Sequence, residues 1–569
     1  MNPFDKKLSR RNFVALVGGS CAVIGAAGLV PRGARADRRE PPPHRRRRPS
    51  VEKLPVGEMR RISTEVLVVG GGMAGVFAAV KAHDAGAEVV LVDKGSVGRS
   101  GQTPFARGIF RYDPETSGMS RDEVLAAVAE ASENMNNPVY TSLLLQDSAA
   151  RCDDLQRWGF FDSVAIAGSL RKPLEERGIP IFERVTLTHL LKADGRIAGA
   201  AGVFLDENGS LAIRAKSVIL CTGASGFKPT GWQIGSLTSD GDAMAYRIGA
   251  EITGKEWCDG HAMTNPGLEG STHIVSEPAI SPMLGVEVNV EVSRDGVPEG
   301  MGPPPGADGD RPDGPPSGGP PSDGNGERPG GPPSGGDGER RGPPPGNLVG
   351  GVSAGMSQHK AEGLFPADDR CASNIPGLYA AGDALGSMQS GGVYTQVGSS
   401  LAGSAVQGAV AGESAAEYVL GIGQGRVSAD TLRELNTEIY APLQREQGFL
   451  PQWVTQTLQG VMIPNFILYV KSAARLEAAL TYVEYLRDHQ VPLLVADDLH
   501  ELRQAHETAN MILNAEMKLR ASLLRTESRG SHYREDYPER DDDEWLAWIK
   551  ISRGEDGGMR LAKHSVPRS

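Results

Sequence analysis

Three glycines and an aspartate near the start of the sequence have the types and spacing to bind a dinucleotide. Gly70, Gly72 and Gly75 follow an apolar run and precede an apolar helical pattern. The first glycine permits a tight turn, the second lets the backbone approach a pyrophosphate, and the third lets helix and strand pack closely. Asp93 ends the next apolar run, where a carboxylate accepts a hydrogen bond from a ribose hydroxyl. Because glycines at this spacing also occur in ordinary turns, the prediction depends on the elements around them.

The elements that must position these residues follow a strand–helix–strand pattern. Residues 66–69 predict a strand buried on both faces, residues 76–85 an apolar helix, and residues 88–92 a second strand. Farther along, residues 196–205 and 210–220 predict a strand pair. The pattern therefore predicts an α/β fold that contains a Rossmann-like dinucleotide-binding domain.

The composition of the chain limits its partners. The 569 residues are 39% hydrophobic, which suffices for several globular domains, and the formal net charge is -12. An acidic chain without a basic reading motif excludes nucleic acid as a partner. The five cysteines form no CxxC pair, so the sequence lacks local signatures for an iron–sulfur cluster or a covalent c-type haem. Such a centre is expected only in a partner.

Residues 1–36 have the pattern of an export signal. Residues 9–14 read Ser-Arg-Arg-Asn-Phe-Val, a weakly apolar run follows, and Ala34-Arg35-Ala36 offers a cleavage site. We therefore predict a twin-arginine signal peptide and a periplasmic or other extracytoplasmic location, with an uncleaved anchor as the alternative. Residues 37–60 are rich in proline and arginine and predict a disordered tail.

Several motifs occur in a fixed order beyond the glycine fingerprint. Residues 100–103 read SGQT, a strand ends in Thr-Gly-Ala at 222–224, and residues 238–242 read TSDGD. Residues 377–383 read GLYAAGD, and residues 527–538 read ESRGSHYREDYP. In these motifs the chain resembles the flavoprotein subunits of succinate dehydrogenase and fumarate reductase. That family also includes L-aspartate oxidase and the flavoprotein subunit of adenylylsulfate reductase.

The resemblance implies FAD as the cofactor and a division into three domains. It assigns residues 61–255 and 350–425 to an FAD-binding domain, residues 256–349 to an inserted α+β capping domain, and residues 426–569 to a C-terminal helical domain. The cap contains a Pro/Gly-rich insert, residues 302–346, which is expected to be disordered.

The helical periodicity of the C-terminal region supports its assignment independently of the resemblance. Apolar residues of two segments fall on single helical faces: Leu476, Leu480, Val483 and Leu486 in one, Leu502, Ala505, Ala509 and Ile512 in the other.

The residues of the matching motifs are expected to surround the cofactor. In family members with covalent FAD a histidine lies beside the position of Ser100, but here that neighbour is Gly101, so the flavin is expected to be noncovalent. Asp383 is expected on the ribityl or pyrophosphate side, and the helix that opens at Ser399 would stabilise negative charge on the reduced flavin. The expected FAD-binding residues are Gly70, Gly72, Met73, Ala74, Gly75, Asp93, Lys94, Ser100, Gly101, Gln102, Thr103, Val185, Thr222, Gly223, Asp240, Gly382, Asp383, Ser399, Ser400 and Leu401.

The substrate side departs from the family pattern. His261 aligns with a substrate-binding histidine of the family, but no Arg-Gly-Glu-Gly-Gly segment follows to supply the family's proton-donating arginine. The family's second substrate histidine falls at about Gly346 and its carboxylate-binding arginine at about Thr395. Without that arginine a bound carboxylate lacks its charge partner. The remaining candidates for a clamp or proton donor are His261, Arg107, Arg294 and His359, each of which also fits an ordinary surface residue.

The sequence therefore predicts an exported FAD-dependent oxidoreductase. It would transfer a hydride between flavin N5 and a small carboxylate or other oxyanionic substrate. Electrons would be exchanged with a separate redox partner, an iron–sulfur or cytochrome subunit, and membrane contact would occur only through that partner or an uncleaved signal. No metal site is predicted. Two alternatives stay open: an adenylylsulfate-reductase-like flavoprotein, and a noncatalytic flavin-binding subunit that relays electrons.

Overall fold

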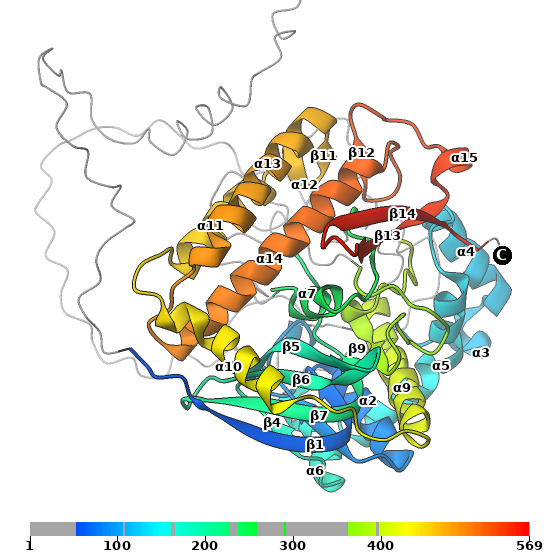
Figure 1. Ribbon diagram of the computed structural model, residues 1–569. Coiled ribbons are helices and arrows are strands. Elements are labelled where there is room, and N and C mark those ends of the chain that lie inside the picture. Colours follow the sequence, from blue (N-terminus) through cyan, green and yellow to red (C-terminus); the bar gives the residue numbers. More distant parts are fainter. Residues whose placement is uncertain are drawn as a thin grey trace, which may run out of the picture.

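The computed structural model describes residues 53–105, 108–160, 166–227, 237–258, 290–291, 362–393 and 398–567 (Figure 1). Its central sheet contains β1 (Glu58–Val69), β2 (Val89–Val92), β4 (Ile181–Phe182), β5 (Val185–Ala193), β6 (Arg196–Phe204), β7 (Gly209–Leu220) and β10 (Leu378–Ala380). The strand order in this seven-stranded sheet is β4-β2-β1-β7-β6-β5, with β10 paired to β7.

Helices surround this sheet and fill the C-terminal half. Those of the first half are α2 (Met73–Asp84), α3 (Pro114–Ser117), α4 (Arg121–Ala131), α5 (Pro138–Arg157), α6 (Ile166–Glu176) and α7 (Asp240–Arg247). Those of the second half are α9 (Ser399–Val419), α10 (Ala429–Gln444), α11 (Pro451–Met462), α12 (Asn465–Leu468), α13 (Ala473–His489), α14 (Leu499–Leu524) and α15 (Asp542–Trp545). Short 3-10 helices are η1 (Thr103–Phe105), η4 (Gly382–Ala384) and η5 (Val491–Leu493).

Five strands of the sheet run parallel, namely β1, β2, β4, β7 and β10, and all but β4 define one functional edge. β1 pairs in parallel with β2 on one side and with β7 on the other, and β10 pairs in parallel with β7. The carboxyl ends of parallel strands meet at the same edge, where ligands of open α/β sheets bind. The glycine fingerprint follows β1, Asp93 follows β2, Thr222 follows β7, and Gly382 follows β10. The fold therefore gathers these predicted residues at a single edge.

Small residues allow α2 and α9 to pack closely beside the sheet. A Cβ atom on Gly408 would overlap the carbonyl oxygen of Ala74, and one on Gly412 would overlap that of Ala78. Close backbone approach of this kind requires glycine. α9 is thereby fixed against α2, and both helices begin at the functional edge.

The C-terminal helices pack into a second core, as their periodicity predicts. Figure 1 shows α11, α13 and α14 side by side above the sheet, and their contacting apolar residues form one cluster. The residues predicted to be apolar and inward-facing are buried at Leu476, Val483, Leu486, Leu502, Ala505 and Ile512 and partly buried at Leu480 and Ala509.

The end of the chain returns to the first half. β13 (Ala547–Arg553) and β14 (Met559–Ser565) form an antiparallel hairpin, and β13 also pairs with β8 (Ile252–Thr253). The remaining strands are short: β3 (Gly108–Ile109), β9 (Val290–Glu291), β11 (Val470–Lys471) and β12 (Tyr533–Arg534). The region expected to be helical therefore ends in strands.

The first strand begins earlier than expected. Glu58 to Arg60, placed by the sequence in the tail 37–60, pair with Gly209 to Leu211 of β7. These residues alternate in exposure and so lack the apolar run that marks a buried strand. The proposed signal, most of the tail and most of the cap, including the insert, lie outside the described residues. Within the described part of the chain, no helix has the length and apolar character needed to cross a membrane.

Candidate functional site

Asp93 organises the loops that follow β1 and β2. Its carboxylate accepts hydrogen bonds from the N–H groups of Gly71 and Gly95, each at 2.6 Å, and from the Ser100 hydroxyl at 2.9 Å. An ionised carboxylate offers about four lone-pair positions. The side chain therefore joins both loops and retains acceptor capacity for one more donor, such as a ribose hydroxyl.

The glycine fingerprint forms a turn with no room for a Cβ atom at Gly70 or Gly75. Gly70 has φ +110°, and a Cβ there would overlap the carbonyl oxygen of Cys221. A Cβ on Gly75 would overlap the carbonyl oxygen of Gly70. Val185, at the start of β5, contacts the loop after β2, because its N–H donates to the carbonyl oxygen of Asp93 at 3.1 Å. The end of β7 and the starts of α2 and β5 are thus brought to the edge.

Polar side chains connect the loop after β2 to the other strand ends. The Thr103 hydroxyl accepts a hydrogen bond from the N–H of Met73 at 3.1 Å. Gln102 Nε2 donates to Asp383 Oδ2, also at 3.1 Å. The SGQT segment consequently contacts both the start of α2 and η4.

Two buried glutamines link η4 to the start of α9. The N–H of Gly382 donates to Gln407 Oε1 at 3.0 Å, and Gln407 Nε2 donates to Gln389 Oε1 at 3.1 Å. Gln389 Nε2 in turn donates to the carbonyl oxygen of Ser399 at 3.1 Å. This chain of amides fixes the N-terminus of α9 relative to Gly382.

The helices that begin at this edge have N-termini without side-chain caps. α2, α7 and α9 each lack a hydrogen bond from the side chain of the N-cap residue. Ser120, Ser428 and Asp498 cap α4, α10 and α14, whereas α11 and α13, away from this edge, also lack such a bond. The first N–H groups of a helix have no intrahelical acceptor and carry partial positive charge. The edge therefore presents several donors suited to an anionic ligand.

Lys94 sits in a partly buried polar cluster beside the start of α7. Its ammonium donates to Thr238 Oγ1 at 2.7 Å, Asp240 Oδ2 at 2.8 Å and Glu507 Oε1 at 2.9 Å. Burial alone would lower the pKa of Lys94, but the charges of Asp240 and Glu507 outweigh it and raise that pKa above its usual value. Burial would raise the pKa of Asp240, yet the Lys94 charge and the hydrogen bonds lower it. Both groups are therefore ionised at neutral pH.

These contacts bring together the segments predicted to bind the cofactor. The remaining predicted residues lie on the same loops and helix starts: Gly72, Ala74, Gly101, Thr222, Gly223, Ser400 and Leu401. The four catalytic candidates, His261, Arg107, Arg294 and His359, lie outside the described residues.

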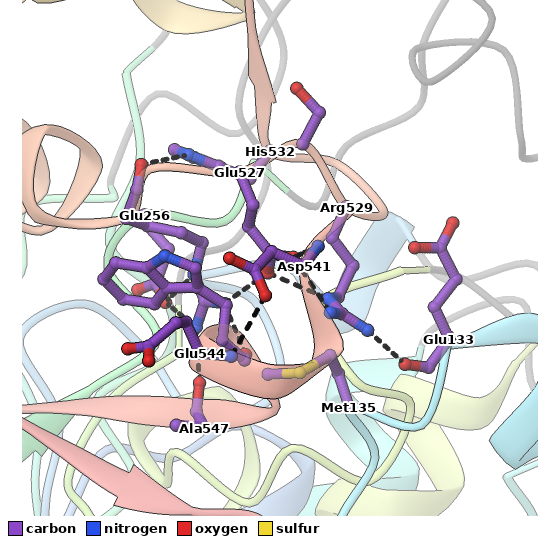
Figure 2. A network of polar contacts seen from close by, with 12 residues as sticks. Glu133, Met135, Glu256, Glu527, Arg529, His532, Asp541, Glu544 and Ala547 are labelled. Carbon is purple, nitrogen blue, oxygen red and sulfur yellow. Dashed lines mark hydrogen bonds and ion pairs between the residues drawn. The ribbon is translucent and has the colours of Figure 1, made fainter. Parts of the chain in front are cut away.

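A second polar region lies where the end of α14 meets the segment after β8. We call the ion pairs of Glu256, Arg525, Glu527 and Arg529 the closing network. Arg525 Nη2 lies 3.1 Å from Glu256 Oε1, and Arg525 Nη1 lies 2.7 Å from Glu527 Oε1. Arg529 Nη2 lies 2.9 Å from Glu527 Oε2. All four side chains have 0% exposure. Figure 2 shows Glu527 directed toward Arg529, whose guanidinium also reaches the carbonyl oxygen of Glu133 at 2.8 Å.

Buried lysines hold the backbone of the same segment. Lys518 donates to the carbonyl oxygens of Lys255 at 3.2 Å and Trp257 at 3.0 Å. Lys471 donates to the carbonyl oxygen of Glu256 at 2.8 Å. Three consecutive carbonyl groups are thus fixed by side chains of the C-terminal region, directly before the position of His261 in the sequence.

Lys471 and His532 form a buried pair next to this backbone. Their Nζ and Nδ1 atoms lie 2.9 Å apart. Burial lowers the pKa of Lys471 to about 7 and that of His532 well below its usual value. The histidine is therefore neutral at physiological pH, and the lysine changes protonation near neutrality.

Ser531 joins two distant segments. It accepts a hydrogen bond from the N–H of Cys258 at 3.1 Å, and its hydroxyl donates to the carbonyl oxygen of Gly392 at 2.7 Å. The ESRGSHYREDYP motif thus connects the segment after β8 with the loop before α9.

Two protein-family models match this chain. The family model described as FAD binding domain matches residues 65–166 and 160–260. The model described as fumarate reductase flavoprotein C-term matches residues 455–567. Together they cover the closing network and the part of the functional edge that follows β1, β2 and β7. The chain is an FAD-dependent oxidoreductase of the fumarate reductase/succinate dehydrogenase family.

Relatives and solved structures match almost the whole chain. One subunit of the fumarate reductase (CoM/CoB) of Methanothermobacter marburgensis is 26% identical, over 86% of this chain and 97% of its own length. L-aspartate oxidase of Streptomyces coelicolor is 25% identical, over 89% and 94% respectively.

The solved structures support the fold. E. coli quinol fumarate reductase FrdA superposes with a TM-score of 0.65 at 17% identity, over 90% of this chain and 98% of that one. Adenylylsulfate reductase from Archaeoglobus fulgidus gives the same TM-score at 18% identity, over 92% and 100%. The expected α/β architecture with an FAD-binding domain and a C-terminal helical domain is confirmed.

FAD is the cofactor of this family, and the residues at the functional edge fit it. A Cβ atom at Gly70 or Gly75 would overlap the protein's own backbone, so glycine preserves the tight turn and the close helix–strand packing of a dinucleotide-binding fingerprint. The uncapped N-terminus of α2 suits a pyrophosphate, and Asp93 retains acceptor capacity for a ribose hydroxyl.

Four polar residues that support this edge are not among the residues predicted from the sequence. Gln389 and Gln407 connect η4 to α9, while Glu507 and Asn510 reach the edge from α14. For Glu507 and Asn510 a signal was available in the sequence: a carboxylate and an amide three residues apart in a helix with a long apolar face. Such groups are rarely buried without partners, so the pattern indicates polar contacts there.

Proposed function

We propose that the protein is an exported flavoenzyme that transfers a hydride between FAD and a small oxyanionic substrate. The observation that carries the proposal is the convergence of the predicted FAD motifs at one sheet edge, in a chain whose C-terminal region holds the backbone of residues 255–257, shortly before His261. Family membership supports the redox chemistry, and the relatives include proteins named as fumarate reductases.

FAD would supply the hydride acceptor or donor at N5. Asp93 would hold the ribose, the N-terminus of α2 the pyrophosphate, and the N-terminus of α9 the flavin edge that becomes negative on reduction. These groups are preorganised by hydrogen bonds to one another, which limits the reorganisation needed on cofactor binding.

The substrate would be held by positive charge and protonated by a nearby acid. His261, Arg107, Arg294 and His359 are the proposed candidates for these roles. Support comes from sequence alignment for His261 and from charge alone for the others. Because the family's carboxylate-binding arginine is replaced at about Thr395, we propose a substrate that differs from fumarate in its anionic group or in its contacts.

We further propose noncovalent FAD, a separate redox partner and extracytoplasmic location. Gly101 cannot form the histidyl bond of the covalent family members. The absence of cysteine motifs for a cluster or haem supports an electron carrier on another chain. Residues 9–14 and the small residues before Asp37 support twin-arginine export.

The decisive experiment uses protein purified without residues 1–36 and loaded with FAD. The flavin is reduced anaerobically and its reoxidation is followed with fumarate, other enoic acids and adenylylsulfate. Reoxidation by an enoic acid supports the proposal, and reoxidation by adenylylsulfate alone replaces it with the adenylylsulfate-reductase-like function. If the flavin is redox-active but no compound reoxidises it, the protein is instead an electron-relaying subunit. Flavin that stays in the supernatant after acid precipitation would confirm noncovalent binding.

A further inference from the structure

α14 reaches from the C-terminal core to the functional edge. The helix spans 26 residues, and Figure 1 shows it crossing the molecule above α7. Glu507 and Asn510 lie in its first half, and both contact residues predicted to bind FAD. Their side chains thus connect two regions that the sequence assigns to different domains.

The ammonium of Lys94 has no proton left for the cofactor. A lysine ammonium has three N–H donors. Here they meet Thr238 Oγ1, Asp240 Oδ2 and Glu507 Oε1, all within 2.9 Å. Lys94 therefore acts on the cofactor site through the groups that it orients.

Asp240 is held from both sides. Its Oδ1 accepts a hydrogen bond from Asn510 Nδ2 at 2.9 Å, and its Oδ2 accepts from Lys94 and from the Thr238 hydroxyl at 2.9 Å. Asp240 is the first residue of α7, whose N-terminus has no side-chain cap. The position of this helix end is thus determined by groups on α14 and on the loop after β2.

The cluster is also balanced in charge. Glu507 accepts a second ion pair from Arg503 at 2.7 Å, and its side chain is 9% exposed. Two cations and two carboxylates therefore lie together. Removing one buried charge leaves its partner uncompensated, which is costly in a medium of low polarity.

We propose that Glu507 and Asn510 are positioning residues for FAD. They hold Lys94 and Asp240 so that the end of β2 and the start of α7 keep the spacing that the cofactor requires. Docking of α14 and binding of FAD then stabilise each other, because coupling between two binding events is reciprocal. This inference goes beyond the proposed function and needs no substrate.

α14 offers a matched control in Glu516. Its side chain is 4% exposed and pairs with Arg487 at 2.6 Å and Arg520 at 2.8 Å. Glu507 and Glu516 thus share helix, burial and number of cationic partners, but Glu516 is bonded to no predicted FAD residue in the contacts described. Glu516→Gln consequently measures the general cost of losing a buried carboxylate on this helix.

The test measures FAD affinity and thermal stability of apoprotein variants. Glu507→Gln is expected to raise the Kd for FAD about tenfold, and Asn510→Ala about threefold, from the loss of one or two hydrogen bonds. Both should also reduce the rise in Tm that saturating FAD produces. Glu516→Gln should lower Tm without FAD while leaving the Kd within twofold of wild type.

Equal effects of Glu507→Gln and Glu516→Gln on the Kd would overturn the proposal, as would an unchanged Kd in both Glu507→Gln and Asn510→Ala. If Glu507→Gln does not fold, Asn510→Ala decides alone, because it removes no charge. Absence of turnover on the substrate panel has no bearing on these outcomes.

Discussion

The functional edge and the closing network are both buried and polar, but they satisfy their polar groups differently. At the edge, Asp93 and the uncapped helix ends retain capacity for further hydrogen bonds. In the closing network, Arg525 and Arg529 are paired with carboxylates at 2.7 to 3.1 Å. The first region keeps donors and acceptors available for a ligand, whereas among the described residues the second leaves only Glu256 Oε2 without a hydrogen-bond partner. We therefore expect changes at the edge to affect mainly FAD binding, and changes in the network to affect mainly folding.

The largest effect is expected from Glu527→Gln. This change leaves two fully buried arginines with one carboxylate fewer, and removing one partner of a buried ion pair costs about 3–5 kcal/mol. We expect urea unfolding of the FAD-loaded protein to show a loss of that size. Glu207→Gln, which breaks the exposed pair with Arg60, serves as control and should unfold like wild type. Similar stability of the two variants would contradict the contrast between network and surface.

The next effect is a dependence of stability on pH, expected from Lys471, which lies beside the closing network. The folded-state pKa of Lys471, lowered to about 7 by burial, lies below its ordinary value of 10.5. Between these values the unfolded chain binds more protons, so the contribution of this group to stability rises as pH rises. From pH 7.5 to 9.5 wild type should gain about 2 kcal/mol relative to Lys471→Met, since a full proton difference contributes about 1.4 kcal/mol per pH unit.

Equilibrium unfolding at several pH values measures this gain. Lys172→Met alters an exposed lysine on α6 and should leave the pH dependence as it is in wild type. A parallel pH profile for Lys471→Met and wild type would show that Lys471 keeps an ordinary pKa in the fold.

Gly75→Ala tests the edge. The added methyl group would overlap the carbonyl oxygen of Gly70 and displace the fingerprint turn. Overpacking costs of about 1–3 kcal/mol, if expressed in the cofactor site, weaken FAD binding about tenfold to a hundredfold. Flavin fluorescence titration of the apoprotein gives the Kd. Gly460→Ala, in α11 with open space around the new methyl group, should leave the Kd unchanged and stabilise the fold slightly.

Asp93→Asn should have the smallest effect. The amide keeps one oxygen acceptor, but its NH2 group would face an N–H donor of the loop, either Gly71 or Gly95. We expect a Kd for FAD raised about five- to tenfold, from one unmade hydrogen bond. Asp194→Asn, in the turn between β5 and β6, is the control for loss of charge alone. A Kd equal to wild type in Asp93→Asn would remove Asp93 from the cofactor site.

The sequence predicted the edge well because its signals are local. The glycines at 70, 72 and 75, the apolar runs before them and the Asp93 position all lie within one strand–helix–strand unit, and the structure forms that unit. The strand pair is confirmed as β6 and β7, with ends within one residue of the prediction.

Long-range pairings were not predictable in the same way. The pairing of β13 with β8, and the contact of Glu507 with Lys94, join residues that are hundreds of positions apart. No periodicity encodes such pairs, because a local pattern reports the burial of its own segment and not the identity of a distant partner. The catalytic residues stay a prediction, since His261, Arg107, Arg294 and His359 fall outside the described residues.

The pairing of β8 with β13 also sets an order for biosynthesis. The Thr253 hydroxyl donates to the carbonyl oxygen of Ile549 at 2.9 Å, across a separation of 296 residues. During translation the sheet from β1 to β7 can form while the chain is still growing, but β8 can pair with β13 only after residues 547–553 have been synthesised. A ribosome that stalls before residue 547 would therefore release a chain in which β8 keeps its bridge to Leu364 but exposes the edge that β13 covers, and quality-control proteases would recognise that edge.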